Sequence, residues 1–181
     1  MSTNSTISLL QEDGSIAQIY SHWDGYLEHN GKILKNHYAD YDKVKSLIDN
    51  GDLSSLRENI DPARGSNHDF DDPDDDVCVF YGRDRGENDI EARHYTDIDL
   101  FASTKHMWAE EYNYFYAGGK WYLLTGKDSG SEITDEMIKQ GDYDKDTYEE
   151  IEHPSAPLKT IIRKNKLKNY EKTLDLIESV V

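Results

Sequence analysis

A dense run of carboxylates near the middle of the sequence is the first feature that could do chemistry. Six of the eight residues from position 69 to position 76 are aspartates: Asp69, Asp71, Asp72, Asp74, Asp75 and Asp76. Such a run has three interpretations: a solvated loop, a surface that imitates nucleic-acid phosphates, or a calcium site built from oxygen ligands. The formal net charge of -17 directs the second interpretation toward basic protein surfaces, because an acidic chain repels nucleic acid itself.

A second acidic group follows near position 146. It consists of Asp142, Asp144, Asp146, Glu149 and Glu150. The three alternating aspartates imitate the start of an EF-hand loop, but that loop needs Gly at its sixth position and Glu at its twelfth. The chain has Thr147 and His153 there, so we expect no metal site. Both acidic groups are therefore candidate contacts for a basic partner.

The segment from His22 to Tyr26 combines aromatic, acidic and imidazole side chains within five positions. His22 and Asp24 could form an acid–base pair, because side chains at a strand end reach solvent. The competing interpretation is that these two residues hydrogen-bond the turn while Trp23 and Tyr26 pack against the fold. A metal-assisted enzyme using His22, Asp24 and Glu87 is a further hypothesis, but no residue is assigned a catalytic role.

Two arginines lie in the glycine-bounded turn 82–87, directly after a hydrophobic stretch. Arg83 and Arg85 could bind phosphate or carboxylate through bidentate hydrogen bonds. Together with the aromatic segment described above, they would form a pocket for a nucleotide-type anion. They could equally pair with acids of the fold, such as Asp24 or Asp76. The turn lacks the glycine spacing and the lysine of a P-loop.

The elements that must position these residues indicate an α+β fold. Two antiparallel pairs are expected, 6–11 with 15–22 and 111–116 with 120–125, and further strands at 77–81 and 90–96. Helices are expected from the caps Asp40, Asp97 or Asp99, and Thr134, with another over 31–38 and a helical turn at 52–56. We predict a single domain with a mainly antiparallel sheet, helices packed on one face, acidic loops and a C-terminal helical tail.

The charge pattern divides the chain into three parts. Residues 1–126 would form the α+β core, 127–158 an acidic connection, and 159–181 a basic helical segment. That last segment either folds back on the acidic body or acts as an interaction arm or dimerisation helix. The single cysteine, Cys78, excludes an internal disulfide and is expected to be a buried strand residue. Without features of a signal peptide or a membrane span, the protein is expected in the cytoplasm.

Several linked motifs resemble those of a known group of proteins. The motifs are His22-Trp23-Asp24-Gly25-Tyr26, the segment Gly51–Leu56 and the segment Tyr81–Glu87, within a match over roughly residues 5–125. This pattern is similar to a family of small, mostly uncharacterised proteins from bacteriophages, prophages and bacteria. The resemblance implies a setting in a host cell, where small acidic phage proteins disable host enzymes or defence systems. It implies no catalytic residue.

We therefore expect a phage-type acidic protein that inhibits a host or defence protein by occupying its nucleic-acid-binding surface. The alternatives are a protein that binds or sequesters a nucleotide-type anion and a metal-assisted enzyme. The expectation includes no cofactor, no direct contact with nucleic acid or membrane, and an open choice between monomer and homodimer.

Overall fold

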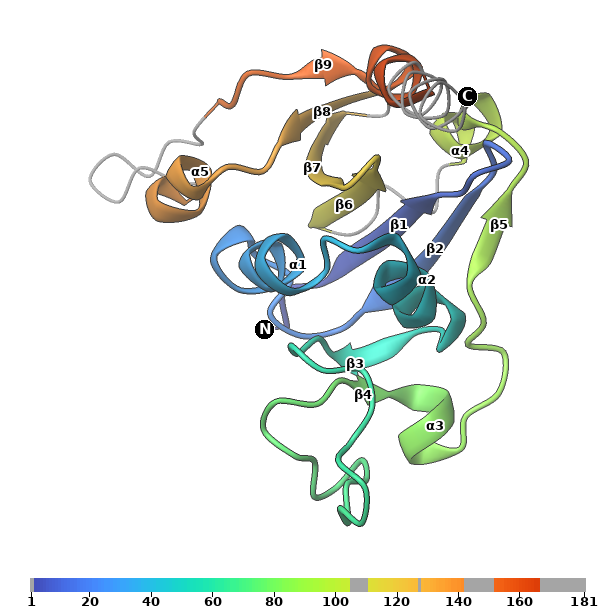
Figure 1. The fold of residues 1–181 in the computed structure, drawn as a ribbon, viewed down its shortest axis with the longest axis vertical. Coiled ribbons are helices and arrows are strands. Elements are labelled where there is room, and N and C mark those ends of the chain that lie inside the picture. The colour runs from blue at the N-terminus through green and yellow to red at the C-terminus, as the bar shows by residue number, and fades with distance from the viewer. Residues whose placement is uncertain (1, 105–110, 127, 142–151, 167–181) are drawn as a thin grey trace, which may run out of the picture.

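The computed structural model of the protein describes residues 2–104, 111–126, 128–141 and 152–166. Within these residues the strands form one mixed sheet (Figure 1). The strands are β1 (Ser5–Leu10), β2 (Ile16–Ser21), β3 (Leu53–Ser55), β4 (Val79–Phe80), β5 (Arg93–Tyr95), β6 (Tyr112–Ala117), β7 (Lys120–Gly126), β8 (Ser129–Glu132) and β9 (Ala156–Pro157). Their order is β4-β3-β2-β1-β6-β7-β8-β9, and β5 lies beside β2.

Most neighbouring strands run antiparallel, as expected. The two exceptions are the parallel pairs β1–β6 and β2–β3. The pairing of β1 with β6 joins the two predicted hairpins into one sheet, with Ile7 opposite Tyr114. The structure therefore confirms the α+β class and the single mainly antiparallel sheet.

Helices cover both faces of the sheet, whereas the sequence led us to expect them on one face. The π-helical turn η1 (Leu27–Gly31), α1 (Lys32–His37), α2 (Tyr41–Asp49) and α5 (Asp135–Gln140) lie over one face. The core beneath them includes Ile7, Leu9, Ile19, Leu34, Leu47, Tyr114, Tyr116 and Trp121. On the opposite face, α4 (Ile98–Ser103) and a helical segment, residues 158–166, pack against Phe115, Tyr122 and Leu124. Alternation along β6 explains this, because Tyr114 and Tyr116 face one side and Phe115 faces the other.

Three helices begin at the predicted capping residues. The Asp40 carboxylate accepts a hydrogen bond from the Lys43 backbone N–H at 3.0 Å. The Asp97 carboxylate accepts a hydrogen bond from the Leu100 backbone N–H at 2.9 Å. The Thr134 hydroxyl oxygen accepts one from the Met137 backbone N–H at 3.2 Å. Each cap satisfies a backbone donor that the first helical turn leaves without a partner.

Two segments differ from their predicted form. The segment 52–56 is not a helical turn, because Leu53 and Ser55 pair with Phe80 and Val79 as strand β3. Leu53 also accepts a hydrogen bond from the His22 backbone N–H at 3.1 Å, which extends the contact with β2. The strand expected over 77–81 is shorter, since Tyr81 already begins the helical turn α3 (Tyr81–Arg85).

The acidic connection expected at 127–158 contributes β8, α5 and β9 to the same body as residues 5–126. The helical segment 158–166 then buries Leu158 and Ile161 against the second face of the sheet. Cys78 is fully buried, as predicted, but it directly precedes strand β4 instead of lying within it; burial raises the pKa of its thiol. No helix among the described residues has the length and apolar character needed to cross a membrane.

Candidate partner-binding surface

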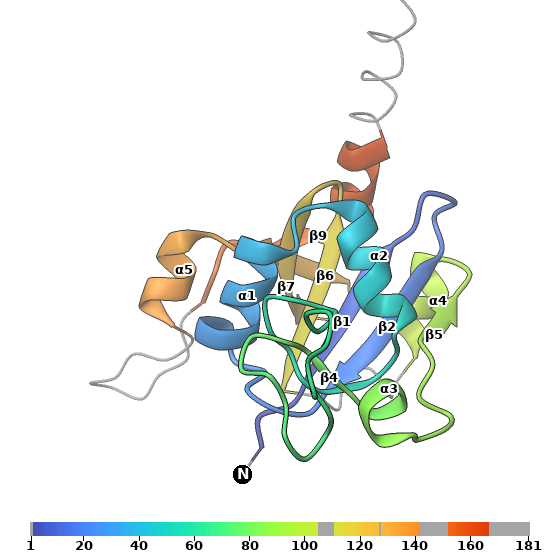
Figure 2. The same cartoon turned by 60° about the horizontal axis from the view of Figure 1, so that its bottom comes forward.

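The first run of aspartates lies in the acidic loop, residues 58–76, which connects β3 to β4. Figure 2 shows this loop at the front of the molecule with α3 beside it. Asp69 folds the loop locally, because its Oδ1 accepts hydrogen bonds from the backbone N–H groups of Asp71 at 2.9 Å and Asp72 at 2.8 Å. Asp74 accepts from the Ser66 hydroxyl, and Asp76 accepts from the Asn59 amide at 2.8 Å. The run is therefore a turn folded by its own hydrogen bonds, and not an unstructured solvated loop.

Three carboxylates of this turn remain available to a partner. Asp71, Asp72 and Asp75 are exposed, and within the described part of the chain no hydrogen bond or ion pair uses their carboxylates. Asp69 and Asp76 are also exposed, although each has one oxygen engaged inside the loop. The arrangement presents several negative charges within one short turn whose backbone is fixed.

Arg83 on α3 attaches the acidic loop to the body. Its guanidinium donates to the carbonyl oxygens of Ile60 and Cys78, both at 2.6 Å. It also donates to both carboxylate oxygens of Asp84, at 2.6 and 2.8 Å. Because these carbonyls lie near the two ends of the loop, Arg83 helps to hold the loop closed, together with backbone hydrogen bonds of Asn59 to Asp76 and Cys78. The sequence left open whether Arg83 binds a ligand or the fold, and the structure places it in contact with the fold.

Asp84 and His68 form the buried part of this attachment. Their side chains are only 4% and 1% exposed, with His68 Nε2 3.4 Å from Asp84 Oδ2. His68 Nδ1 accepts a hydrogen bond from the Asp74 backbone N–H at 3.0 Å, and His68 Nε2 lies 3.1 Å from an Arg83 guanidinium nitrogen. Burial alone would raise the pKa of Asp84, but hydrogen bonds from Arg83 and the Phe80 backbone N–H lower it overall.

A second contact uses aromatic and cationic groups. The Phe70 ring lies 5.9 Å from the Tyr81 ring, and the Arg85 guanidinium lies 4.8 Å from the centre of the Phe70 ring. Arg85 also pairs with Glu87 at 3.1 Å. Phe70 is the one large apolar residue of the run, and its position among aspartates was the sequence signal that this loop packs against something. From the sequence we did not predict that His68 and Phe70 attach the loop to the body.

The segment from His22 to Tyr26 forms a fixed turn at the end of β2. The Trp23 backbone N–H donates to the Ser54 carbonyl at 3.0 Å, and the Trp23 carbonyl accepts from the Asn30 side chain at 3.3 Å. Asp24 has a positive φ of 56°, which is rare for a residue other than glycine. The turn is tight because Gly25 packs against the Asn4 backbone, leaving no space for a Cβ.

The indole of Trp23 remains accessible within this rigid turn. Its residue is 45% exposed, and the His22 ring meets it edge-on at 4.7 Å between centroids. His22 Nδ1 is in turn hydrogen-bonded to the Tyr20 hydroxyl at 2.7 Å. Among the described residues no hydrogen bond or ion pair joins His22 to Asp24, so the structure provides no acid–base pair there.

The nucleotide pocket considered from sequence is not assembled by these residues. No hydrogen bond, ion pair or ring contact of the described residues joins Arg83 or Arg85 to Trp23 or Tyr26. Tyr26 instead lies 5.8 Å from His29 and precedes η1. In the described part of the chain no group of three His, Cys, Asp or Glu side chains could hold a metal ion.

The second acidic group lies outside the described residues. This holds for Asp142, Asp144, Asp146, Glu149 and Glu150. Comparison of the chain with models of protein families, with curated proteins and with solved structures gives no match.

Proposed function

We propose that the protein binds a basic, nucleic-acid-binding surface of another protein and blocks that surface. In the setting that the sequence motifs suggest, the target is a host or defence protein and the source is a phage. The observation that carries the proposal is the attachment of the acidic loop by Arg83, His68 and Phe70. It keeps exposed carboxylates in a fixed arrangement before any partner binds.

Preorganisation gives this arrangement its binding value. A flexible acidic segment would lose conformational freedom when it docks, and that loss weakens association. The acidic loop has already been ordered by bonds inside the protein, so carboxylates can meet arginine and lysine side chains with less loss. The net charge of -17 adds long-range attraction, which raises the association rate and falls as salt rises.

Trp23 supports the proposal as an aromatic anchor. Interface hot spots are enriched in Trp, Tyr and Arg, and an indole face also attracts arginine and lysine. The backbone of Trp23 is held by Ser54 and Asn30, while the residue is almost half exposed. The protein thus presents both carboxylates and an exposed aromatic residue to a basic partner surface.

The test uses three forms of the protein as baits in a host lysate at low salt. One is wild type, and one carries Asp71→Asn, Asp72→Asn and Asp75→Asn. The matched control loses three exposed acids elsewhere, through Asp42→Asn, Glu91→Gln and Glu136→Gln. We expect the wild-type and control baits to retain one nucleic-acid-handling protein, which is released as salt is raised. The loop variant should not retain that protein. Equal retention by the loop variant and the control would contradict the proposal.

A further inference from the structure

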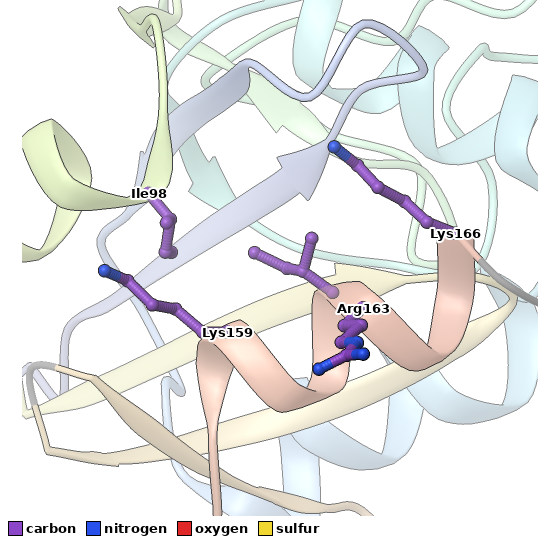
Figure 3. Close-up of a pocket in the computed structure, with 5 residues that line it drawn as sticks. Ile98, Lys159, Arg163 and Lys166 are labelled. Atoms are coloured by element: carbon purple, nitrogen blue, oxygen red, sulfur yellow. The ribbon is translucent and has the colours of Figure 1, made fainter.

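A pocket on the other side of the sheet combines positive charge with apolar surface. It lies between α4 and the helical segment 158–166 and has a volume of about 370 Å³ (Figure 3). Its lining residues are Ile98, Lys159, Ile162, Arg163 and Lys166. Among the residues that the structure describes, no acidic side chain lines it, although the chain as a whole carries a net charge of -17. The pocket is therefore a positively charged region on a protein whose net charge is negative.

The helical segment creates this pocket through its spacing. Leu158 and Ile161 point into the core, where they are 0% and 4% exposed. Helical side chains three and four positions apart share a face, so a second row lies beside the buried one. That row consists of Lys159, Ile162, Arg163 and Lys166. Ile98, the first residue of α4, completes the apolar floor.

The three cations of the pocket are not equivalent. Lys159 donates to Asp99 at 2.6 Å, and this ion pair raises the pKa of Lys159. Arg163 and Lys166 are exposed and have no hydrogen bond or ion pair in the described part of the chain. Figure 3 shows Lys166 extending toward the β1–β2 hairpin, where its Nζ lies 3.5 Å from the position of a Cβ added at Gly14. Within the described residues, two positive charges thus lie beside two isoleucines without an acidic partner.

We propose that this pocket binds an organic phosphate of mononucleotide size. Its volume falls within the range of about 300 to 1,000 Å³ typical of small-molecule sites. The apolar body of such a ligand would cover Ile98 and Ile162, and its phosphate would contact Lys166 and Arg163. An inorganic anion leaves the isoleucines unused, and a neutral ring compound leaves the charges unused. The proposal does not depend on the acidic loop or its partner.

Calorimetry with three probes tests the proposal at low salt: AMP, adenosine and inorganic phosphate. The site variant combines Arg163→Gln and Lys166→Gln. The control combines Arg64→Gln and Lys139→Gln, which removes the same charge from exposed positions on the acidic loop and α5. We expect AMP to bind more tightly than either fragment, the site variant to lose at least about tenfold in affinity, and the control to match wild type.

A second measurement does not require a variant. Backbone amide shifts of the wild-type protein should change on AMP addition at Ile98 and at residues 159–166, and not in the acidic loop. The proposal is overturned if AMP does not bind, if it binds no tighter than phosphate alone, or if the control loses as much affinity as the site variant. Shifts confined to other residues would also overturn it.

Discussion

Removal of the Arg83 guanidinium should loosen the attachment of the acidic loop to the body. In Arg83→Met, the carbonyls of Ile60 and Cys78 lose a donor and the Asp84 carboxylate loses its bidentate partner. The Asp84 side chain is 4% exposed, so water can replace that partner only poorly. Removing one member of a buried ion pair costs about 3–5 kcal/mol. Because Arg83 itself is 25% exposed, we take the lower end, about 3 kcal/mol.

Thermal unfolding measures this loss of stability. For a chain of this size, 1 kcal/mol shifts Tm by about 2–4 °C, so Arg83→Met should lower Tm by roughly 6–12 °C. The matched control is Arg85→Met, which loses an exposed ion pair with Glu87 and a cation–π contact with Phe70, each contributing at most about 1 kcal/mol. Equal effects of the two substitutions would refute the assigned role of Arg83.

Limited proteolysis adds a local measurement. Arg64 is an exposed trypsin site inside the acidic loop. If Arg83 holds the loop closed, Arg83→Met should speed cleavage after Arg64 well below the temperature at which the whole chain unfolds. Unchanged cleavage in the variant would show that the loop is held by other contacts.

Three further predictions concern other parts of the structure. Burial alone would raise the pKa of Asp84, but its hydrogen bonds keep that pKa below the usual 3.8. The wild-type protein should therefore lose stability as pH falls below 3.8. In acid unfolding, Asp84→Asn should show a flatter dependence of stability on pH. Trp23→Ala should change the free energy of unfolding by less than about 1 kcal/mol, as measured by denaturant unfolding. The same substitution should weaken partner binding by about 2 kcal/mol or more, roughly 30-fold, as measured by titration with the partner. Gly51→Ala should destabilise by about 1–3 kcal/mol more than Gly86→Ala, because both have positive φ but only at Gly51 would a Cβ overlap the Ile90 carbonyl. Equal losses in a denaturant titration of those two variants would disprove the overlap.

Much of the fold was predictable where local chemistry determines it. Asp40, Asp97 and Thr134 cap helices because a carboxylate or hydroxyl can satisfy a nearby backbone donor. The hairpin of β6 and β7 follows from alternating aromatic residues around Gly118 and Gly119. Pairings between distant segments were not predictable, and β3 is the clearest example. Leu53 and the neighbouring Leu56 suit a helix or a strand, and only contact with β2 and β4 decides between them.

The candidate surface was predictable in composition but not in structure. The aspartates indicated a charged surface, and the structure shows that they belong to a folded turn. That folding depends on Arg83 reaching carbonyls 23 and 5 positions away in the sequence, and on the burial of His68. Such contacts depend on the path of the chain, which residue type and spacing do not specify.

The most direct test of the central claim is a competition experiment with the protein that the wild-type bait captures. Its affinity for a DNA or RNA probe is measured with wild type, with the triple loop variant and with the matched control, over a series of salt concentrations. We predict that wild type and control displace the probe, that their affinity falls steeply with salt, and that the loop variant binds more weakly with a shallower salt dependence. A partner that still binds its probe inside the complex, or a loop variant that competes as well as wild type, would contradict the account.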